Sequence, residues 1–220
     1  MTGRSNGGGQ LKFNQLKSGH SGFSLVELMI AMVIAILSLG AIYSVFASVQ
    51  KTSTSNEVNA RVMQSLRTSI DLMESDIRMA GFDRFGVAGA GIEAATAISL
   101  RFTADRDLDG AIYTDSSLSD GLEERDLERI TYFYDAPNNR LRQCLSEGTK
   151  DEWDTVAENV ENFSFQYFDE NNDLIAIPIT DLSLIRFVEV SITVSQSAGI
   201  SGDISRTITR RIYCRNLAMK

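Results

Sequence analysis

The sequence has almost no histidine: His20 is the only one in 220 residues, and it lies ahead of the first long apolar run. The rest of the chain therefore lacks the base of Ser–His and Cys–His nucleophilic sites and the imidazole ligands of zinc. Aspartate and glutamate are common, with 29 residues, but such side chains mostly lie on protein surfaces in contact with water. We therefore expect that the protein is not an enzyme. Carboxylate chemistry in a membrane-anchored enzyme is the alternative that composition leaves open.

The N-terminal part of the chain has a long run without charge and a longer stretch without proline. Residues 28–49 hold no charged side chain, and no proline occurs between Phe23 and Ala80. At a rise of about 1.5 Å per residue, this uncharged run is long enough to cross the hydrocarbon core of a bilayer as a helix. Glu27 stands at its edge, where an ionisable group costs free energy unless it has a partner. The sequence thus predicts a membrane span with a functional carboxylate at its start.

The flanks of the run indicate its orientation. Arg4, Lys12 and Lys17 precede it, with no acidic residue among positions 1–22. The positive-inside rule then places the N-terminus in the cytoplasm and the C-terminal part outside it. A secretory signal peptide has a shorter apolar core, with a small-residue cleavage site after it. We therefore expect a single-pass membrane protein.

The junction between the basic leader and the apolar run carries a specific motif. Residues Gly22 to Glu27 read GFSLVE, which resembles the prepilin peptidase site of type IV pilins and type II secretion pseudopilins. The resemblance implies cleavage between Gly22 and Phe23 and N-methylation of Phe23. It also implies a role for Glu27 in assembly, in which the α-amino group of a neighbouring subunit's Phe23 neutralises the carboxylate. The alternative is a plain signal anchor in which the glycine and the glutamate occur by chance.

Cleavage at this position would make an acidic protein more acidic. Removal of three positive charges moves the formal net charge from −8 to −11. A basic face is the usual footprint of nucleic-acid binding. We therefore expect no direct contact with nucleic acid.

The apolar pattern continues beyond the span as one stripe of a helix. Its members recur every three or four residues: Val58, Val62, Leu66, Ile70, Met73, Ile77 and Ala80. This spacing predicts one nearly continuous helix from about Ser24 to Ala80, with Gly81 as its C-cap and Gly40 as its one weak point. We expect the stripe to pack against the following domain. A coiled coil with a partner is the alternative.

After Gly81 the sequence changes to short β-prone runs separated by turn residues. The runs are residues 97–103, 128–134, 140–145, 162–168, 174–177, 184–195 and 204–214. Pro137, Asn138 and Asn139 stand between two of them and indicate a hairpin turn. We expect an α+β fold, in which an antiparallel sheet of about four to six strands packs on the long N-terminal helix. The segments are then a leader (1–22), a transmembrane half (23–50) and an amphipathic half (51–81) of the helix, and a β-rich domain outside the cytoplasm (82–220).

Two further segments narrow the resemblance. Residues 76–82 read DIRMAGF and residues 210–217 read RRIYCRNL, and both resemble segments of PilW-type minor pilins. This resemblance implies a role in priming or supporting pilus assembly. The implied partners are prepilin peptidase, other major and minor pilins, and the inner-membrane assembly platform. The implied location is the inner membrane and, after assembly, the pilus, a fibre of motility and cell adhesion. A J-like pseudopilin of type II secretion and a membrane-anchored adhesin or binding module are the alternatives.

Cysteine is scarce as well. Cys144 and Cys214 are the only two, and both follow the membrane span. Two cysteines in an oxidising compartment favour a disulfide. Both also lie in strand-like runs, so two separate buried thiols are the alternative.

One acidic segment has the spacing of a calcium loop. Asp105, Asp107 and Asp109 alternate along the chain and Gly110 follows them, which matches the D-x-D-x-D-G opening of such loops. The usual glutamate at the twelfth position is replaced by Ser116, with Asp115 as a substitute ligand. A solvated acidic turn is the favoured interpretation and calcium is the alternative. Residues 169–173 are a weaker version of the pattern, and no other cofactor is expected.

Overall fold

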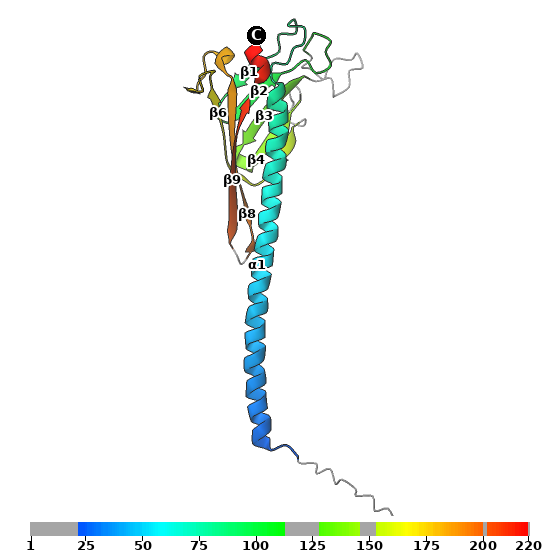
Figure 1. Cartoon of the computed structure of the whole chain (residues 1–220), viewed down its shortest axis with the longest axis vertical. Helices are drawn as coiled ribbons and strands as arrows, with labels where there is room; N and C mark the ends of the chain where they lie inside the picture. Colours follow the sequence, from blue (N-terminus) through cyan, green and yellow to red (C-terminus); the bar gives the residue numbers. More distant parts are fainter. Residues whose placement is uncertain (1–21, 113–127, 146–152, 200–201, 220) are drawn as a thin grey trace, which may run out of the picture. The chain divides into compact units, whose positions relative to one another are not determined.

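The structure, a computed structural model, describes residues 22–112, 128–145, 153–199 and 202–219 (Figure 1). It divides into two compact units, residues 1–48 and 49–220. One long helix, α1 (Leu25–Met79), begins in the first unit and ends in the second. The strands are β1 (Ile92–Ala95), β2 (Ser99–Thr103), β3 (Arg129–Asp135), β4 (Arg140–Cys144), β5 (Asp154–Ala157), β6 (Val160–Phe168), β7 (Leu174–Ile175), β8 (Phe187–Ser197) and β9 (Asp203–Tyr213). The α+β fold class predicted from the sequence is confirmed.

The first unit consists, in its described part, of the start of α1 and the three residues before it. The amide of Leu28 donates to the carbonyl of Ser24 over 3.1 Å, so helical hydrogen bonding starts one residue before Leu25. Helix α1 runs through Gly40 without a break. Helical residues 25–48 alone extend about 36 Å at 1.5 Å per residue, which exceeds the thickness of a bilayer's hydrocarbon core, about 30 Å.

The second unit contains two antiparallel sheets where the sequence predicted one. The strand order is β1-β2-β3-β4-β5 in one sheet and β7-β6-β8-β9 in the other. Strands β1 and β5 were not predicted; each has only four residues and lies at an edge of the five-stranded sheet. The predicted hairpin turn is present between β3 and β4, where Asn139 adopts the left-handed conformation with φ of +52°. β9 is an edge strand of eleven residues.

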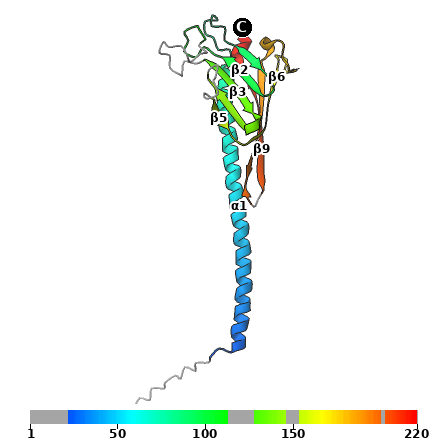
Figure 2. The same cartoon turned by 180° about the vertical axis from the view of Figure 1, so that it is seen from behind.

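Both sheets share a core with the C-terminal part of α1, which Figures 1 and 2 show alongside them. The predicted helix stripe is confirmed: Val58 is half-buried, and the other six members are buried. Ser69 is also buried on this face, although a hydroxyl gave no signal in the sequence. Its Oγ reaches the carbonyl of Ser65 over 2.9 Å and that of Val156 over 3.0 Å, so the hydroxyl is satisfied by the helix and by β5.

A polar contact inside the core joins α1 to the five-stranded sheet. Tyr132 is fully buried on β3, and its hydroxyl donates to Oδ2 of Asp76 over 2.7 Å. Nε2 of Gln143, on β4, donates to the same carboxylate oxygen over 2.7 Å. Burial and, second, the charge of Asp76 raise the pKa of Tyr132. The phenol therefore stays protonated and donates a hydrogen bond to Asp76.

Helix α1 ends at a junction with the C-terminus of the chain. Gly81 has a φ of +74°, as the predicted C-cap requires, and its amide donates to the carbonyl of Thr103 over 2.9 Å. A Cβ at Gly81 would stand 2.3 Å from Cδ2 of Leu217. Nδ2 of Asn216 donates to the carbonyl of Arg78 over 3.0 Å. The side chains that follow β9 therefore cover the helix end.

Candidate processing and assembly site

The predicted cleavage junction precedes the helix and is open to solvent. Gly22, Phe23 and Ser24 have no regular structure, and all three are exposed, with 85% of Phe23 accessible. A Cβ added at Gly22 would meet nothing within 4 Å, and its φ is not in the left-handed region. Nothing in the described chain therefore requires a glycine there. A requirement for glycine at position 22 would instead come from another protein that recognises this segment, such as a peptidase.

Glu27 lies in the first turn of α1, with its side chain exposed. A carboxylate in this position interacts favourably with the partial positive charge of a helix N-terminus. It is the only charged side chain from Gly22 to Gln50. Glu27 and the residue that would become the new N-terminus, Phe23, thus lie four positions apart at the same end of the apolar segment.

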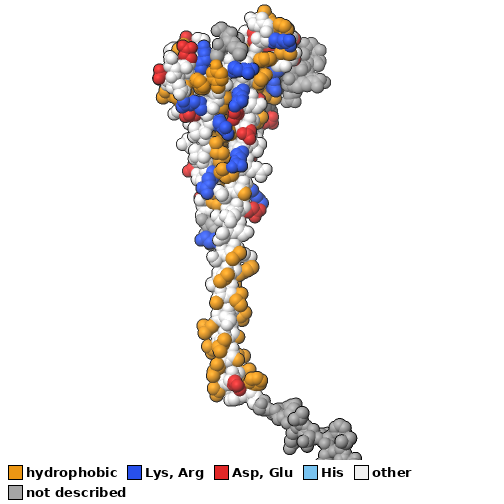
Figure 3. Space-filling view, in the orientation of Figure 1, with side chains coloured by type: hydrophobic (Ala, Val, Ile, Leu, Met, Phe, Trp, Pro, Cys, Tyr) orange, Lys and Arg blue, Asp and Glu red, His pale blue; other side chains and the backbone are white. Residues whose placement is uncertain are grey.

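The apolar part of α1 exposes hydrophobic side chains all round. Every large apolar residue from Phe23 to Val49 is more than half accessible, and Figure 3 shows hydrophobic side chains along the face of the helix that is in view. Its hydroxyls have partners within the helix: Ser38 donates to the carbonyl of Ile34 and Ser44 to that of Ala41, each over 2.8 Å. A helix that is hydrophobic on all sides is stable only in lipid or inside a protein assembly. By length and composition α1 is able to cross a membrane.

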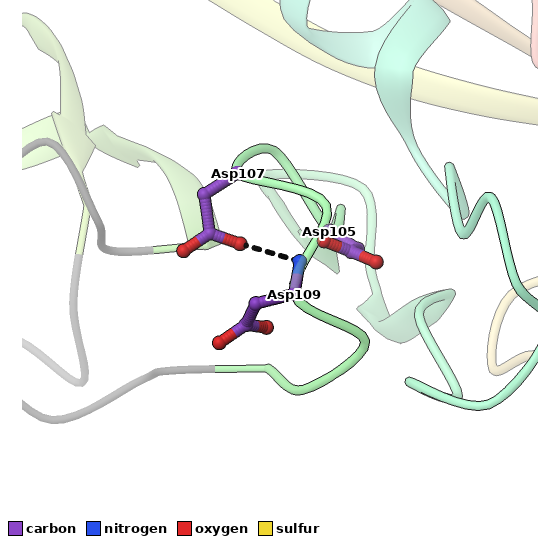
Figure 4. A group of neighbouring side chains, drawn as sticks. All are labelled: Asp105, Asp107 and Asp109. Carbon is purple, nitrogen blue, oxygen red and sulfur yellow. Dashed lines mark hydrogen bonds between the residues drawn. The ribbon is translucent and has the colours of Figure 1, made fainter.

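The acidic loop between β2 and β3 brings its three aspartates together. Oxygens of Asp105, Asp107 and Asp109 lie within 4.8 Å of one another, as Figure 4 shows for the three side chains. Each Oδ1 accepts a hydrogen bond from a backbone amide of the loop: Asp105 from Leu108 over 2.8 Å, Asp107 from Asp109 over 3.1 Å, and Asp109 from Ala111 over 2.8 Å. Asp115 and Ser116 lie outside the described residues.

The three carboxylates differ in their surroundings. Asp107 and Asp109 are exposed, whereas Asp105 is fully buried. Among the described residues, Oδ2 of Asp105 is one of two buried side-chain polar atoms without a hydrogen-bond partner. This observation disagrees with a fully solvated acidic turn, which was the favoured interpretation of the sequence.

Glu128 binds the backbone of the acidic loop, and the sequence did not mark it as a site residue. It is fully buried, and its Oε1 accepts from the amide of Arg106 over 2.5 Å. Its carbonyl accepts from the amide of Ala104 over 3.0 Å. The sequence signal was a glutamate at the first position of a β-prone run, but only the folded chain shows that it meets a loop 22 positions earlier.

The weaker acidic turn at residues 169–173 has a different arrangement. Oδ1 of Asp169 accepts from the amides of Asn171 and Asp173, each over 2.9 Å, and these contacts are exposed. In the described part of the chain, the loop at residues 105–109 is the one group of three acidic, cysteine or histidine residues with the spacing of a metal site.

Both cysteines are buried thiols in the structure. Cys144 ends β4 in the five-stranded sheet, and Cys214 follows β9 of the other sheet. Burial raises the pKa of the Cys214 thiol to about 12, although the charge of Arg186 opposes this shift. Of the two alternatives from the sequence, the structure has separate thiols and not the disulfide.

Comparison with known proteins addresses the N-terminal segment. Residues 17–43 match the family model of the prokaryotic N-terminal methylation motif. No curated protein matches the chain. The matched residues span the cleavage junction, Glu27 and the first part of α1, and leave the β-rich domain uncovered. Proteins with this motif are structural subunits and not enzymes, and an apolar N-terminal helix fits membrane anchoring. The motif supports a prepilin-like protein of the type IV pilin and pseudopilin kind.

Proposed function

We propose that the chain is a minor pilin of a type IV pilus, of the PilW type, which prepilin peptidase cleaves after Gly22. One observation carries the proposal: the N-terminal methylation motif lies on a helix whose apolar surface is exposed on all sides within the described chain. The mature subunit, residues 23–220, is inserted into the pilus or primes its assembly.

Glu27 and the N-terminus of Phe23 are complementary groups for assembly. An ionised carboxylate held in lipid is costly, and cleavage creates a positive α-amino group four residues before it. When subunits meet, the amino group of one neutralises the Glu27 of its neighbour and offsets that cost. The pair would therefore favour insertion beside another subunit over isolation in the membrane.

The PilW assignment has support from the end of the helix. The two segments that resemble PilW-type minor pilins, residues 76–82 and 210–217, meet at the junction described above. Asn216 bonds the carbonyl of Arg78, and Leu217 fills the space left by the missing side chain of Gly81. The two segments are thus in contact, which is consistent with their similarity to the same group of proteins.

The membrane topology follows from the basic leader. Arg4, Lys12 and Lys17 remain in the cytoplasm, so the domain after the span lies outside it. The protein is then anchored once in the inner membrane until it enters the pilus. Its partners are prepilin peptidase, other major and minor pilins and the inner-membrane assembly platform.

The first test is the intact mass of the full chain, expressed with and without prepilin peptidase and extracted in detergent. With the peptidase we expect residues 23–220 bearing one N-methyl group. Gly22→Val should leave the leader attached. Gly40→Val is the matched control, because Gly40 also has open space around it and should not affect cleavage. Retention of residues 1–22 beside an active peptidase would overturn the proposal.

A second test separates the minor pilin from its alternatives. Deletion of the gene should abolish or sharply reduce piliation and leave type II secretion intact, and sheared pili should contain the protein in low copy. Loss of secretion with normal piliation would identify a pseudopilin. Ligand binding by membranes from cells without fibres, with piliation unchanged on deletion, would identify an anchored adhesin or binding module.

A further inference from the structure

We propose that the loop of Asp105, Asp107 and Asp109 binds one calcium ion. This site is separate from the N-terminal assembly segment and does not depend on the function proposed above. Two observations carry it: the grouping of three carboxylates, and the buried oxygen of Asp105 that has no donor.

The buried oxygen is the stronger of the two. Asp105 has no accessible surface, and its Oδ2 has no hydrogen-bond partner among the described residues. A buried carboxylate oxygen without a hydrogen-bond partner is costly, because it has lost its hydration. An oxygen of Asp105 lies within 4.8 Å of oxygens of two other carboxylates, which would repel it in the absence of a cation. A cation bound among the three carboxylates would offset this repulsion and would give the buried side chain a positive partner.

The ligand type and its setting favour calcium over magnesium. Calcium takes six to eight oxygen ligands in a flexible geometry, whereas magnesium demands near-ideal octahedral geometry and gives up its waters reluctantly. The loop offers oxygens of three carboxylates, of which two are exposed and one is buried. Such an uneven set of oxygens suits the more tolerant ion.

The loop is preorganised for this task. Each aspartate uses Oδ1 to hold a backbone amide, so the side chains are oriented before any ion arrives. Gly110 has a φ of +83° and occupies the position where calcium loops make a sharp turn. Glu128 fixes the start of the loop through the amide of Arg106. The ligand side chains are therefore in position before calcium binds. Asp107 and Asp109 remain exposed, so an ion can reach them from solvent.

The test is calcium titration of the full chain in detergent, by isothermal calorimetry at constant ionic strength. With few carboxylate ligands and an exposed side, we expect a dissociation constant on the order of 10⁻⁴–10⁻³ M, the range of extracellular calcium modules. Magnesium should bind at least tenfold more weakly. Calcium, and not magnesium, should also raise the temperature of unfolding.

Substitutions in the loop test whether the heat of calcium binding comes from this site. Asp107→Asn and Asp109→Asn each remove a ligand charge from an exposed side chain and should weaken calcium at least tenfold. Asp169→Asn is the matched control, because that carboxylate also holds two backbone amides of an exposed turn, and it should leave binding unchanged. The proposal fails if the full chain shows no calcium binding at millimolar concentration. It also fails if both loop variants bind as tightly as the unaltered chain.

Discussion

The contact between Gly81 and Leu217 predicts a specific loss of stability when Gly81 is replaced by alanine. A left-handed backbone costs a residue with a Cβ about 1–2 kcal/mol. The added Cβ also stands 2.3 Å from Cδ2 and 3.2 Å from Cγ of Leu217, and overpacking of this kind costs about 1–3 kcal/mol. Because Leu217 is only half-buried, its side chain relieves part of the overlap. We therefore expect a total loss of about 2–4 kcal/mol.

Two further substitutions separate these two costs. Gly89 has nearly the same φ, +72°, but open space around its Cβ direction, so Gly89→Ala should cost only the backbone share, about 1–2 kcal/mol. Leu217→Ala removes the obstructing side chain. In a double-mutant cycle, Gly81→Ala and Leu217→Ala together should cost less than the sum of the two single changes, by about 1–2 kcal/mol.

The assay is urea unfolding of the full chain in detergent, followed by the fluorescence of Trp153. Trp153 is the only tryptophan, and its ring centroid lies 6.0 Å from that of Phe133 on β3, so it reports on the five-stranded sheet. Equal costs for Gly81→Ala and Gly89→Ala, together with additive values in the cycle, would refute the role of Leu217 in covering the helix end.

Three other predictions concern the core and the assembly segment. Burial raises the pKa of Tyr132 and Tyr167 above the ordinary value of 10.0, so the unfolded chain releases these protons first as pH rises. The free energy of unfolding should therefore fall above pH 10, by about 1.4 kcal/mol per pH unit for each tyrosine. Tyr132→Phe should reduce that slope by one such share; the same slope in the variant and the unaltered chain would contradict the cause. Both thiols should be unreactive in the native chain, because Cys144 and Cys214 are buried. After denaturation without reductant, two thiols per chain should react with a thiol reagent, whereas no reactive thiol would show a disulfide. Glu27→Leu should leave peptidase processing intact and reduce the amount of the protein recovered in sheared pili at least tenfold. Glu57→Gln, at a carboxylate 63% exposed, is the control. Normal recovery of the Glu27→Leu protein would contradict the proposed neutralisation.

The parts of the fold that follow local rules were predictable from the sequence. The apolar run and the 3.6-residue stripe together predicted α1 to within one residue at each end, and Gly81 and Asn139 stand where a left-handed backbone is needed. The division into two sheets was not predictable, because it depends on which strands pair. β1 and β5, with the sequences IEAA and DTVA, are too short to show alternation.

The candidate sites divide in the same way. The junction from Gly22 to Glu27 is a contiguous motif, so the motif could be recognised from the sequence, while cleavage after Gly22 and the role of Glu27 stay predictions. The aspartate spacing was also visible, but the burial of Asp105 was not, because it arises from contacts distant in sequence. The loop is held by Glu128, and the amide of Asp105 donates to the carbonyl of Phe82 over 2.8 Å. Neither contact follows from a pattern.

The long edge strand β9 has a consequence for the proposed assembly of subunits. An uncovered edge of eleven residues is a template for unwanted pairing with another chain, and thus for aggregation. Arg206 reaches across to Asn59 of α1 over 2.9 Å, and Arg210 to Glu74 of α1 over 3.6 Å. Most of β9 is exposed, but these two arginines place positive charge along it, and charge on an edge strand disfavours pairing with a second strand. Under the proposed function, subunits would then associate through their apolar helices without their domains polymerising through the sheet.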